Sequence, residues 1–285
     1  MRERFAFSFQ IQSHFDASVP GIPHFVYTDH TLMANRVFPD MAMAGVNIFV
    51  KPEWLQLERG LYHNTQTNFV MSQHVHRSLI EDYGCDPEHV VCAYGGPNAP
   101  VTPPVDKTYD NKEILFVGVH WIRKGGPQLV EAFRRVRARI PDARLTIVGC
   151  SPEIHVEGCE VRGRVSPSEL AMYYQRASVF CMPTRYEPFG IVYLEAMAYK
   201  LPIVATDVGA IPDFVLNGEN GFRVRPGDFG DLAERLIVLL SNPALCSSMG
   251  KRGSDIAKQY TWERTGRIFR ETIEPYVESY ALEKR

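Results

Sequence analysis

Hydrophobic positions along the chain alternate between short continuous runs and longer stretches with helical spacing. Runs such as Ile114–Val117 and Val179–Met182 are apolar at every position, which is typical of strands buried on both faces of a parallel sheet. Short β-like runs, several of them apolar throughout, predict strands at residues 5–11, 24–28, 67–71, 89–93, 114–118, 144–148, 159–162, 178–182, 203–206 and 222–224. Stretches with a period near 3.6 predict helices at residues 52–61, 73–83, 127–139, 167–176, 190–199, 210–216, 229–241 and 262–282.

The order of these elements predicts an α/β fold with two Rossmann-like parallel-sheet domains. Strands and helices alternate along the chain, as in βαβ units whose sheets are covered on both faces. A segment rich in proline and glycine, 94–112, interrupts the alternation and reads as a linker. We therefore expect the organisation that follows: a partial N-terminal domain at 1–98, a linker at 99–112, a second domain at 113–262 and a C-terminal helix at 263–285.

Composition narrows the class of protein without identifying it. The chain has 285 residues, 45% of them hydrophobic and 22% charged, as in ordinary globular proteins. A net charge of −2 with no basic run argues against a nucleic-acid partner. The six cysteines show no C-x-x-C spacing, which favours reduced cytosolic thiols over disulfides or a zinc site. No run is long enough for a transmembrane helix, so the predicted location is the cytoplasm.

Two carboxylates, Glu187 and Glu195, flank a Pro-Phe-Gly turn and the start of a predicted helix. Ile191, Leu194 and Ala198 have the spacing of one apolar helix face, and Glu195 falls on that face. A charge there costs free energy unless a partner satisfies it. The unpaired N–H groups of the helix start suit a phosphate, whereas carboxylates suit sugar hydroxyls. A ligand that combines both chemistries is a nucleotide sugar.

The segment 187–195 resembles the E-x7-E motif of retaining glycosyltransferases with the GT-B fold, the family-4 type. The resemblance implies that Glu187 contacts the transferred sugar as a catalytic residue. It implies that Glu195 holds the ribose of the nucleotide. It also implies that the backbone N–H groups of Phe189, Gly190 and Ile191 meet the phosphates and the sugar. By spacing alone, the segment also fits an N-cap acid followed by a helix with one misplaced glutamate.

A loop that follows the predicted strand 114–118 resembles the family's diphosphate-binding loop. Lys124 matches the family's lysine before glycine, while Val119 stands where the family usually has arginine. Arg123 could supply that charge from a few residues further on. Lysine and arginine suit this role because a diphosphate in a partly dry cleft needs charge-assisted hydrogen bonds. No G-x-G-x-x-G follows the strand, which argues against NAD or FAD.

Segment 163–170 resembles the family's G-x-V-x-x-x-E-L sequence. In the family its backbone runs beside the nucleotide base, so the implied contacts here are Arg164 and Val165. An ordinary strand-to-helix turn explains the spacing equally well. The glycine turns within 201–213 and 217–222 also resemble family segments, and we interpret them as scaffold.

The N-terminal third carries one candidate, His30, at the end of the predicted strand 24–28. This strand end resembles the family's, whose histidine faces the donor sugar across the cleft, and Asp29 could assist. The alternative is a histidine whose hydrogen bonds are satisfied at a strand end. The first strands and the glycine-rich loop of the family's first domain are not found. We therefore expect an incomplete first domain: the chain is a fragment or a shortened gene product, or the missing half comes from another polypeptide.

These features predict a retaining glycosyltransferase of the hexosyltransferase type. Its donor is a nucleotide diphosphate sugar, and its acceptor is a sugar, a polysaccharide or a lipid-linked hydroxyl. The resemblance implies no cofactor and no metal, in agreement with the absence of an Asp-x-Asp pair. A peripheral contact with the inner face of a membrane is compatible with such acceptors. The alternatives are a binding-only protein or partner-dependent subunit, a phosphorylase, or a sugar-nucleotide epimerase.

Overall fold

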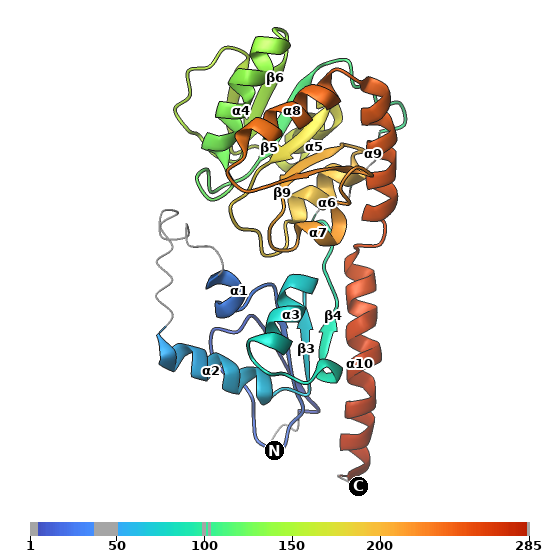
Figure 1. Cartoon of the computed structure of the whole chain (residues 1–285). Coiled ribbons are helices and arrows are strands. Elements are labelled where there is room, and N and C mark those ends of the chain that lie inside the picture. Colours follow the sequence, from blue (N-terminus) through green and yellow to red (C-terminus); the bar gives the residue numbers. More distant parts are fainter. Residues whose placement is uncertain (1–4, 37–50, 99–100, 102–103, 284–285) are drawn as a thin grey trace. The chain divides into compact units, whose positions relative to one another are not determined.

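A computed structural model describes residues 5–36, 51–98, 101 and 104–283. The chain forms two compact units. The first comprises Met1–Gly96 together with Thr261–Arg285, and the second comprises Pro97–Tyr260. The sequence placed the corresponding divisions at residues 98, 113 and 262. Both units are α/β structures built on parallel sheets (Figure 1), as the sequence predicts.

The first unit contains a parallel sheet with the order β1-β2-β3-β4 among the described residues. Its strands are β1 (Ser8–Ile11), β2 (His24–Thr28), β3 (Thr67–Val70) and β4 (Val90–Cys92). Its helices are α1 (Leu32–Arg36), α2 (Pro52–His63), α3 (Gln73–Glu81), the short 3₁₀ helix η2 (Pro87–His89) and α10 (Trp262–Glu283). Strand β1 pairs only with β2 and is therefore an edge strand among these residues.

Both faces of the first sheet are covered, because successive side chains of a strand point to opposite sides. Val26 packs with side chains of α2 and α3, including Leu61 and Leu79. Its neighbours Phe25 and Tyr27 pack on the other face with Ile273 of α10. Helix α10 lies along this face in Figure 1. A segment from the C-terminal end of the chain thus completes the core of the first unit.

Phe269 of α10 offers a test of this packing. Its ring centroid lies 4.7 Å from that of Phe69 and 4.9 Å from that of Tyr27. Truncation to alanine leaves a cavity in an aromatic cluster, so we expect Phe269→Ala to lower the free energy of unfolding of the first unit by about 2–4 kcal/mol. Arg270→Ala, at an exposed neighbour, should change it little. Equal urea midpoints for the two variants would contradict the packing of α10 on this sheet.

The second unit has a parallel sheet with the order β10-β9-β8-β5-β6-β7. Its strands are β5 (Glu113–Val117), β6 (Arg144–Val148), β7 (Cys159–Gly163), β8 (Val179–Met182), β9 (Ile203–Thr206) and β10 (Gly221–Val224). Its helices are α4 (Gly126–Arg139), α5 (Pro167–Arg176), α6 (Ile191–Ala198), α7 (Ile211–Phe214), α8 (Phe229–Leu240) and α9 (Pro243–Ala257). The order is that of a doubly wound fold, in which the chain reverses its direction of travel between β5 and β8.

Helices cover the second sheet on both faces. Helix α4 packs against α8, and α6 packs against α9. On the face that carries α5 and α6, the ring of Tyr174 stacks on that of Tyr199 at 5.2 Å. Helix α9 was not predicted, because its sequence contains two glycines and several serines, which weaken the helical pattern. At Gly250 the packing requires glycine, because a Cβ there would lie 2.0 Å from the carbonyl oxygen of Lys200.

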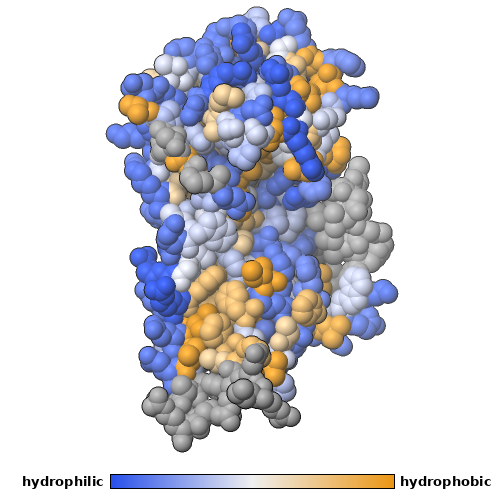
Figure 2. Space-filling model, turned by 180° about the vertical axis from the view of Figure 1, so that it is seen from behind, coloured by the Kyte–Doolittle hydropathy of each residue, from blue (hydrophilic) through white to orange (hydrophobic). Residues whose placement is uncertain are grey.

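Apolar side chains are exposed on the surface of the first unit (Figure 2). Several of them belong to β1 and the segments next to it. Phe5, Ile11 and Phe15 each expose at least 60% of their surface. Among the described residues, the edge of the first sheet formed by β1 and its flanking segments is therefore partly apolar on its surface.

Candidate functional site

The loops after β5 and β8 carry the main candidate residues of the second unit. These two strands are neighbours in the sheet, although β6 and β7 separate them in the chain. Their carboxyl ends mark the point where the order of the strands reverses, and open α/β sheets bind ligands in the crevice beside such a point. The fold therefore brings together the loop with Arg123 and Lys124 and the loop with Glu187.

Hydrogen bonds join the two loops directly. The carbonyl oxygen of Arg123 accepts from the backbone N–H of Arg185 at 2.8 Å and from the Thr184 hydroxyl at 3.2 Å. The Arg123 guanidinium donates to the carbonyl oxygen of Tyr186 at 3.3 Å. Gly125 is required at this contact: its φ is +76°, and a Cβ would lie 1.8 Å from the carbonyl oxygen of Pro183. The relative position of the two loops is therefore fixed by backbone contacts.

Lys124 and Glu187 form a buried ion pair between the two loops. The Lys124 Nζ donates to Glu187 Oε2, and the two residues expose only 9% and 4% of their surfaces. Burial lowers the pKa of the Lys124 ammonium, the neighbouring Arg123 adds to this, and the Glu187 carboxylate opposes it. An ammonium and a carboxylate thus stand side by side at the carboxyl ends of β5 and β8.

The turn after Glu187 leads into α6 through Gly190. This glycine caps the helix with a φ of +91°, a left-handed conformation that glycine adopts without strain. Within the described residues, the N–H groups of Phe189, Gly190 and Ile191 donate no backbone hydrogen bond outside regular elements. Phe189 itself is buried, and its ring packs edge-on against Phe214 at 6.1 Å. The helix start therefore presents free backbone donors close to Glu187.

Glu195 shares a helix face with Ile191 and Ala198, as the sequence predicts, but this face is not turned to the core. The buried residues of the helix are Tyr193, Leu194, Ala196 and Met197. Ile191, Glu195 and Ala198 are half-buried and lie on the side of the helix away from that core. The prediction that the stripe of Ile191, Leu194 and Ala198 faces the core was therefore wrong for all of its members except Leu194. The apolar character of nearly every position in α6 conceals which side faces the core.

A single side chain, Tyr174 of α5, holds the Glu195 carboxylate. Its hydroxyl donates to Glu195 Oε2 at 3.1 Å. Burial raises the pKa of Glu195, while this hydrogen bond and one from the backbone of Asn98 act in the opposite direction. These two partners leave acceptor capacity on the carboxylate for a further donor.

Arg164 and Val165 directly follow β7, two strands away from β5 in the sheet. Arg164 is exposed and Val165 is half-buried. They lie at the same carboxyl edge of the sheet as the loops with Lys124 and Glu187, because all the strands are parallel. Val119, at the place where the resemblance expects arginine, is 55% exposed.

His30 belongs to the first unit and follows β2. Its Nδ1 lies 2.7 Å from Asp29 Oδ1, and Gln12 Nε2 donates to the same oxygen at 3.1 Å. Burial alone would lower the pKa of His30, but the carboxylates of Asp29 and Glu58 outweigh it and raise that pKa. The partnership with Asp29 agrees with the sequence prediction, whereas the part played by Glu58 was not anticipated.

Three residues of these sites were missed in the sequence, namely Gln12, Glu58 and Tyr174. Glu58 gave a usable signal: it occupies the helical stripe of Leu55 and Leu61, where a charge is unusual. Tyr174 and Gln12 gave none, because tyrosine is common in helices and glutamine in loops.

The described residues contain no group of three or more histidine, cysteine, aspartate or glutamate side chains placed to bind a metal ion together. None of the helices in the part of the chain that the structure describes has the length and hydropathy needed to span a bilayer.

The sheet order and the two loops define a Rossmann-like ligand-binding unit of the type found in GT-B enzymes. Residues 111–242, nearly the whole of its sheet region, match the family model described as glycosyl transferases group 1. The second unit belongs to this glycosyltransferase family.

Similarity to curated relatives extends beyond the second unit. A D-inositol 3-phosphate glycosyltransferase from Corynebacterium aurimucosum is 30% identical over 234 residues, which cover 72% of this chain and 56% of the relative. A phosphatidyl-myo-inositol mannosyltransferase from Mycobacterium leprae is 34% identical over 161 residues, covering 53% and 43% respectively. The chain thus spans about half the length of these relatives.

A solved structure shows the same fold. The sucrose-phosphate synthase from Thermosynechococcus elongatus aligns with a TM-score of 0.75 and 24% sequence identity. The alignment covers 89% of this chain and 69% of that structure. The prediction of two Rossmann-like parallel-sheet domains in a GT-B arrangement is therefore confirmed as a fold class.

Proposed function

We propose that this chain transfers a sugar from a nucleotide diphosphate sugar to an acceptor hydroxyl, with retention of the anomeric configuration. The observation that carries the proposal is the pairing of Lys124 with Glu187 at the switch point of a family-matched domain. A cation for a diphosphate and a carboxylate for a sugar stand there side by side. The helix start at Gly190 adds backbone donors next to them.

In this proposal each group has one task. Lys124, Arg123 and the N–H groups near Gly190 stabilise the charge that develops on the leaving diphosphate, which is an electrostatic role. Glu187 accepts hydrogen bonds from the transferred sugar, and Glu195 accepts them from the ribose. Arg164 and Val165 flank the base. His30, in the first unit, donates to the sugar. The reaction needs no metal in this proposal, so EDTA should leave the rate unchanged.

The acceptor is proposed to be a hydroxyl of a sugar, a polysaccharide or a lipid-linked group. The names of the two relatives specify an inositol 3-phosphate and a phosphatidyl-myo-inositol, so cyclitol phosphates belong among the first acceptors to test. A peripheral contact with a membrane and a partner chain that completes the first unit stay predictions. Flotation with acceptor-containing vesicles tests the former, and sedimentation of the purified chain tests the latter.

Calorimetric titration with a panel of nucleoside diphosphates and their sugars tests donor binding. We expect Glu195→Gln to weaken binding about 10–100-fold, since a hydrogen bond to a charged group contributes about 1.5–3 kcal/mol. Glu234→Gln, at an exposed glutamate on α8, is the matched control and should bind as the wild type does. Equal affinities of all three proteins would exclude Glu195 from the donor site.

Product formation tests transfer itself. NMR of the product should show the anomeric configuration of the donor, and Glu187→Gln should lower kcat about 100-fold or more while the protein stays folded. An inverted product would contradict the retaining mechanism. Donor binding with no product from any acceptor would favour the binding-only alternative.

A further inference from the structure

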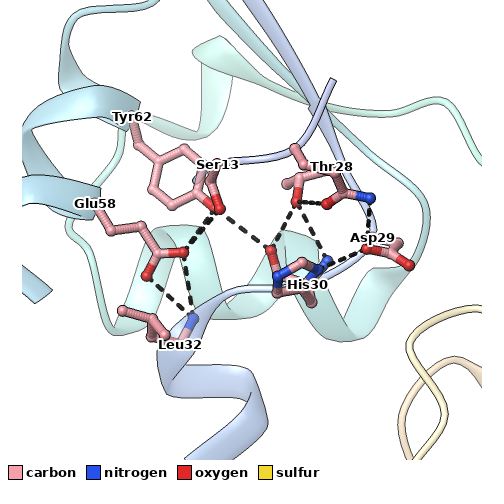
Figure 3. Close-up of polar contacts among 8 residues, drawn as sticks. Ser13, Thr28, Asp29, His30, Leu32, Glu58 and Tyr62 are labelled. Carbon is pink, nitrogen blue, oxygen red and sulfur yellow. Dashed lines mark hydrogen bonds and ion pairs between the residues drawn. The ribbon is translucent and has the colours of Figure 1, made fainter. Parts of the chain in front are cut away.

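Glu58 of α2 is a buried carboxylate without an ion-pair partner among the described residues. It exposes 5% of its surface. Its Oε1 accepts from the Ser13 hydroxyl at 3.0 Å, and its Oε2 accepts from the backbone N–H of Leu32 at 3.1 Å. The Tyr83 hydroxyl also donates to Oε2. Figure 3 shows Ser13, Leu32 and Tyr62 arranged around this carboxylate.

Such a carboxylate is costly, because burial of a charge is unfavourable unless several hydrogen bonds satisfy it. Its donors come from separate segments: the loop after β1, the first turn of α1, α2 itself and the residue Tyr83 beyond α3. A neutral side chain could join α2 to these segments at lower cost. The retention of a charge at this position therefore points to a use for the charge itself.

The contacts of Glu58 converge on the segment that carries His30. The Tyr62 hydroxyl lies 3.2 Å from Glu58 Oε1 and 3.4 Å from the carbonyl oxygen of His30, so its proton is shared between them. The Thr28 hydroxyl also donates to the His30 carbonyl oxygen, at 2.9 Å. Together with the bond from the Leu32 N–H, these contacts hold the backbone on both sides of His30 (Figure 3).

Among the described residues of the first unit, two titratable groups lie beside the His30 ring. Asp29 contacts Nδ1 directly, and the ring of His14 lies 6.1 Å away, centroid to centroid. From α2, the charge of Glu58 acts on the imidazole, and the Tyr62 hydroxyl contacts the His30 carbonyl oxygen. The two carboxylates favour a proton on the imidazole, and they do so from different elements.

We propose that Glu58 is a positioning residue for His30: its hydrogen bonds with the Leu32 N–H and the Tyr62 hydroxyl fix the backbone on both sides of the histidine, and its charge acts on the imidazole across these contacts. The role of this imidazole toward a donor sugar rests on the proposed function. The electrostatic link between Glu58 and His30 does not, and it can be measured in the protein without any substrate.

The test is an NMR titration of the His30 imidazole, with its signal assigned by its loss in His30→Gln. Glu58→Gln keeps the shape of the side chain and one of its two acceptor oxygens but removes the charge. We expect it to lower the pKa of His30 by about 1 unit, the size expected for a neighbouring charge in a partly buried site. Glu53→Gln makes the same change at an exposed position of the same helix and should leave that pKa unchanged. Identical His30 titrations in all three proteins would overturn the proposal.

Tyr62→Phe tests whether the hydrogen bond to the His30 carbonyl positions the backbone at His30. It also provides a second test if Glu58→Gln does not fold. It retains the charge of Glu58 but removes the donor shared with the His30 carbonyl. We expect an unchanged His30 pKa and, in the transfer assay, a kcat about tenfold lower with an unchanged KM for the donor. A wild-type kcat would contradict the positioning role. If the wild type transfers no sugar, the proposed function fails while the titrations still decide the link between Glu58 and His30.

Discussion

Lys124→Met is expected to lower the free energy of unfolding of the second unit by about 3–5 kcal/mol, since it leaves a buried carboxylate without its cation. Glu187 exposes 4% of its surface and has Lys124 as its ion-pair partner. In the double variant Lys124→Met/Glu187→Leu no charge remains to be desolvated, and most of the lost stability should return. Urea unfolding of Lys124→Met, of Glu187→Leu and of the double variant measures the coupling free energy between the two side chains.

Lys112→Met provides the control for this cycle. Lys112 forms an ion pair of 2.7 Å with Asp142, but the pair lies at the surface, where the two side chains expose 36% and 66% of their area. Exposed pairs contribute little to stability, so this variant should unfold close to the wild type. A Lys124→Met protein as stable as Lys112→Met would show that the pair between the two loops is not buried in solution. The double variant should have no transferase activity in either case.

Gly209→Ala is expected to destabilise the second unit by more than about 3 kcal/mol, because overpacking and a left-handed backbone act together. A Cβ at this position would lie 2.0 Å from the carbonyl oxygen of Glu187, and the φ of Gly209 is +54°. The loop with Glu187 would have to move, so donor binding should weaken about tenfold or more. Urea unfolding and calorimetry measure the two effects.

Gly218→Ala separates the two causes. Gly218 has a φ of +83°, and a Cβ there meets nothing within 4 Å. The substitution therefore carries only the cost of the left-handed backbone, about 1 kcal/mol. If both alanine variants lost the same stability, the close approach of Gly209 to Glu187 would not exist in solution.

The strands were predictable because their apolar runs are continuous and are bounded by turn residues. Each predicted strand is present with shifts of a few residues at its ends, as at 5–11, where β1 begins at Ser8. The helices were less predictable. Helix α9 was not predicted, because Gly250 lowers the local helix propensity. The glycine is needed there for close packing on Lys200, which is a tertiary contact.

The candidate residues were located from short motifs and the resemblance, but their partners were not. The sequence placed Lys124 and Glu187 in two loops, yet the ion pair between them depends on β8 lying beside β5. Glu195 was assigned to the core face of α6 because nearly all of that helix is apolar. The contact of Glu58 with Leu32 joins positions 26 residues apart, and no local pattern indicates such a pairing.

The attachment of α10 to the first sheet has a consequence for biosynthesis. Residues 97–260 form a continuous segment that can fold as soon as it leaves the ribosome, whereas the aromatic face of Phe25, Tyr27 and Phe69 must wait for residues near 270. Until then this aromatic face of the nascent chain is exposed to solvent. Binding of chaperones to the nascent chain should therefore fall sharply once α10 has emerged from the ribosome.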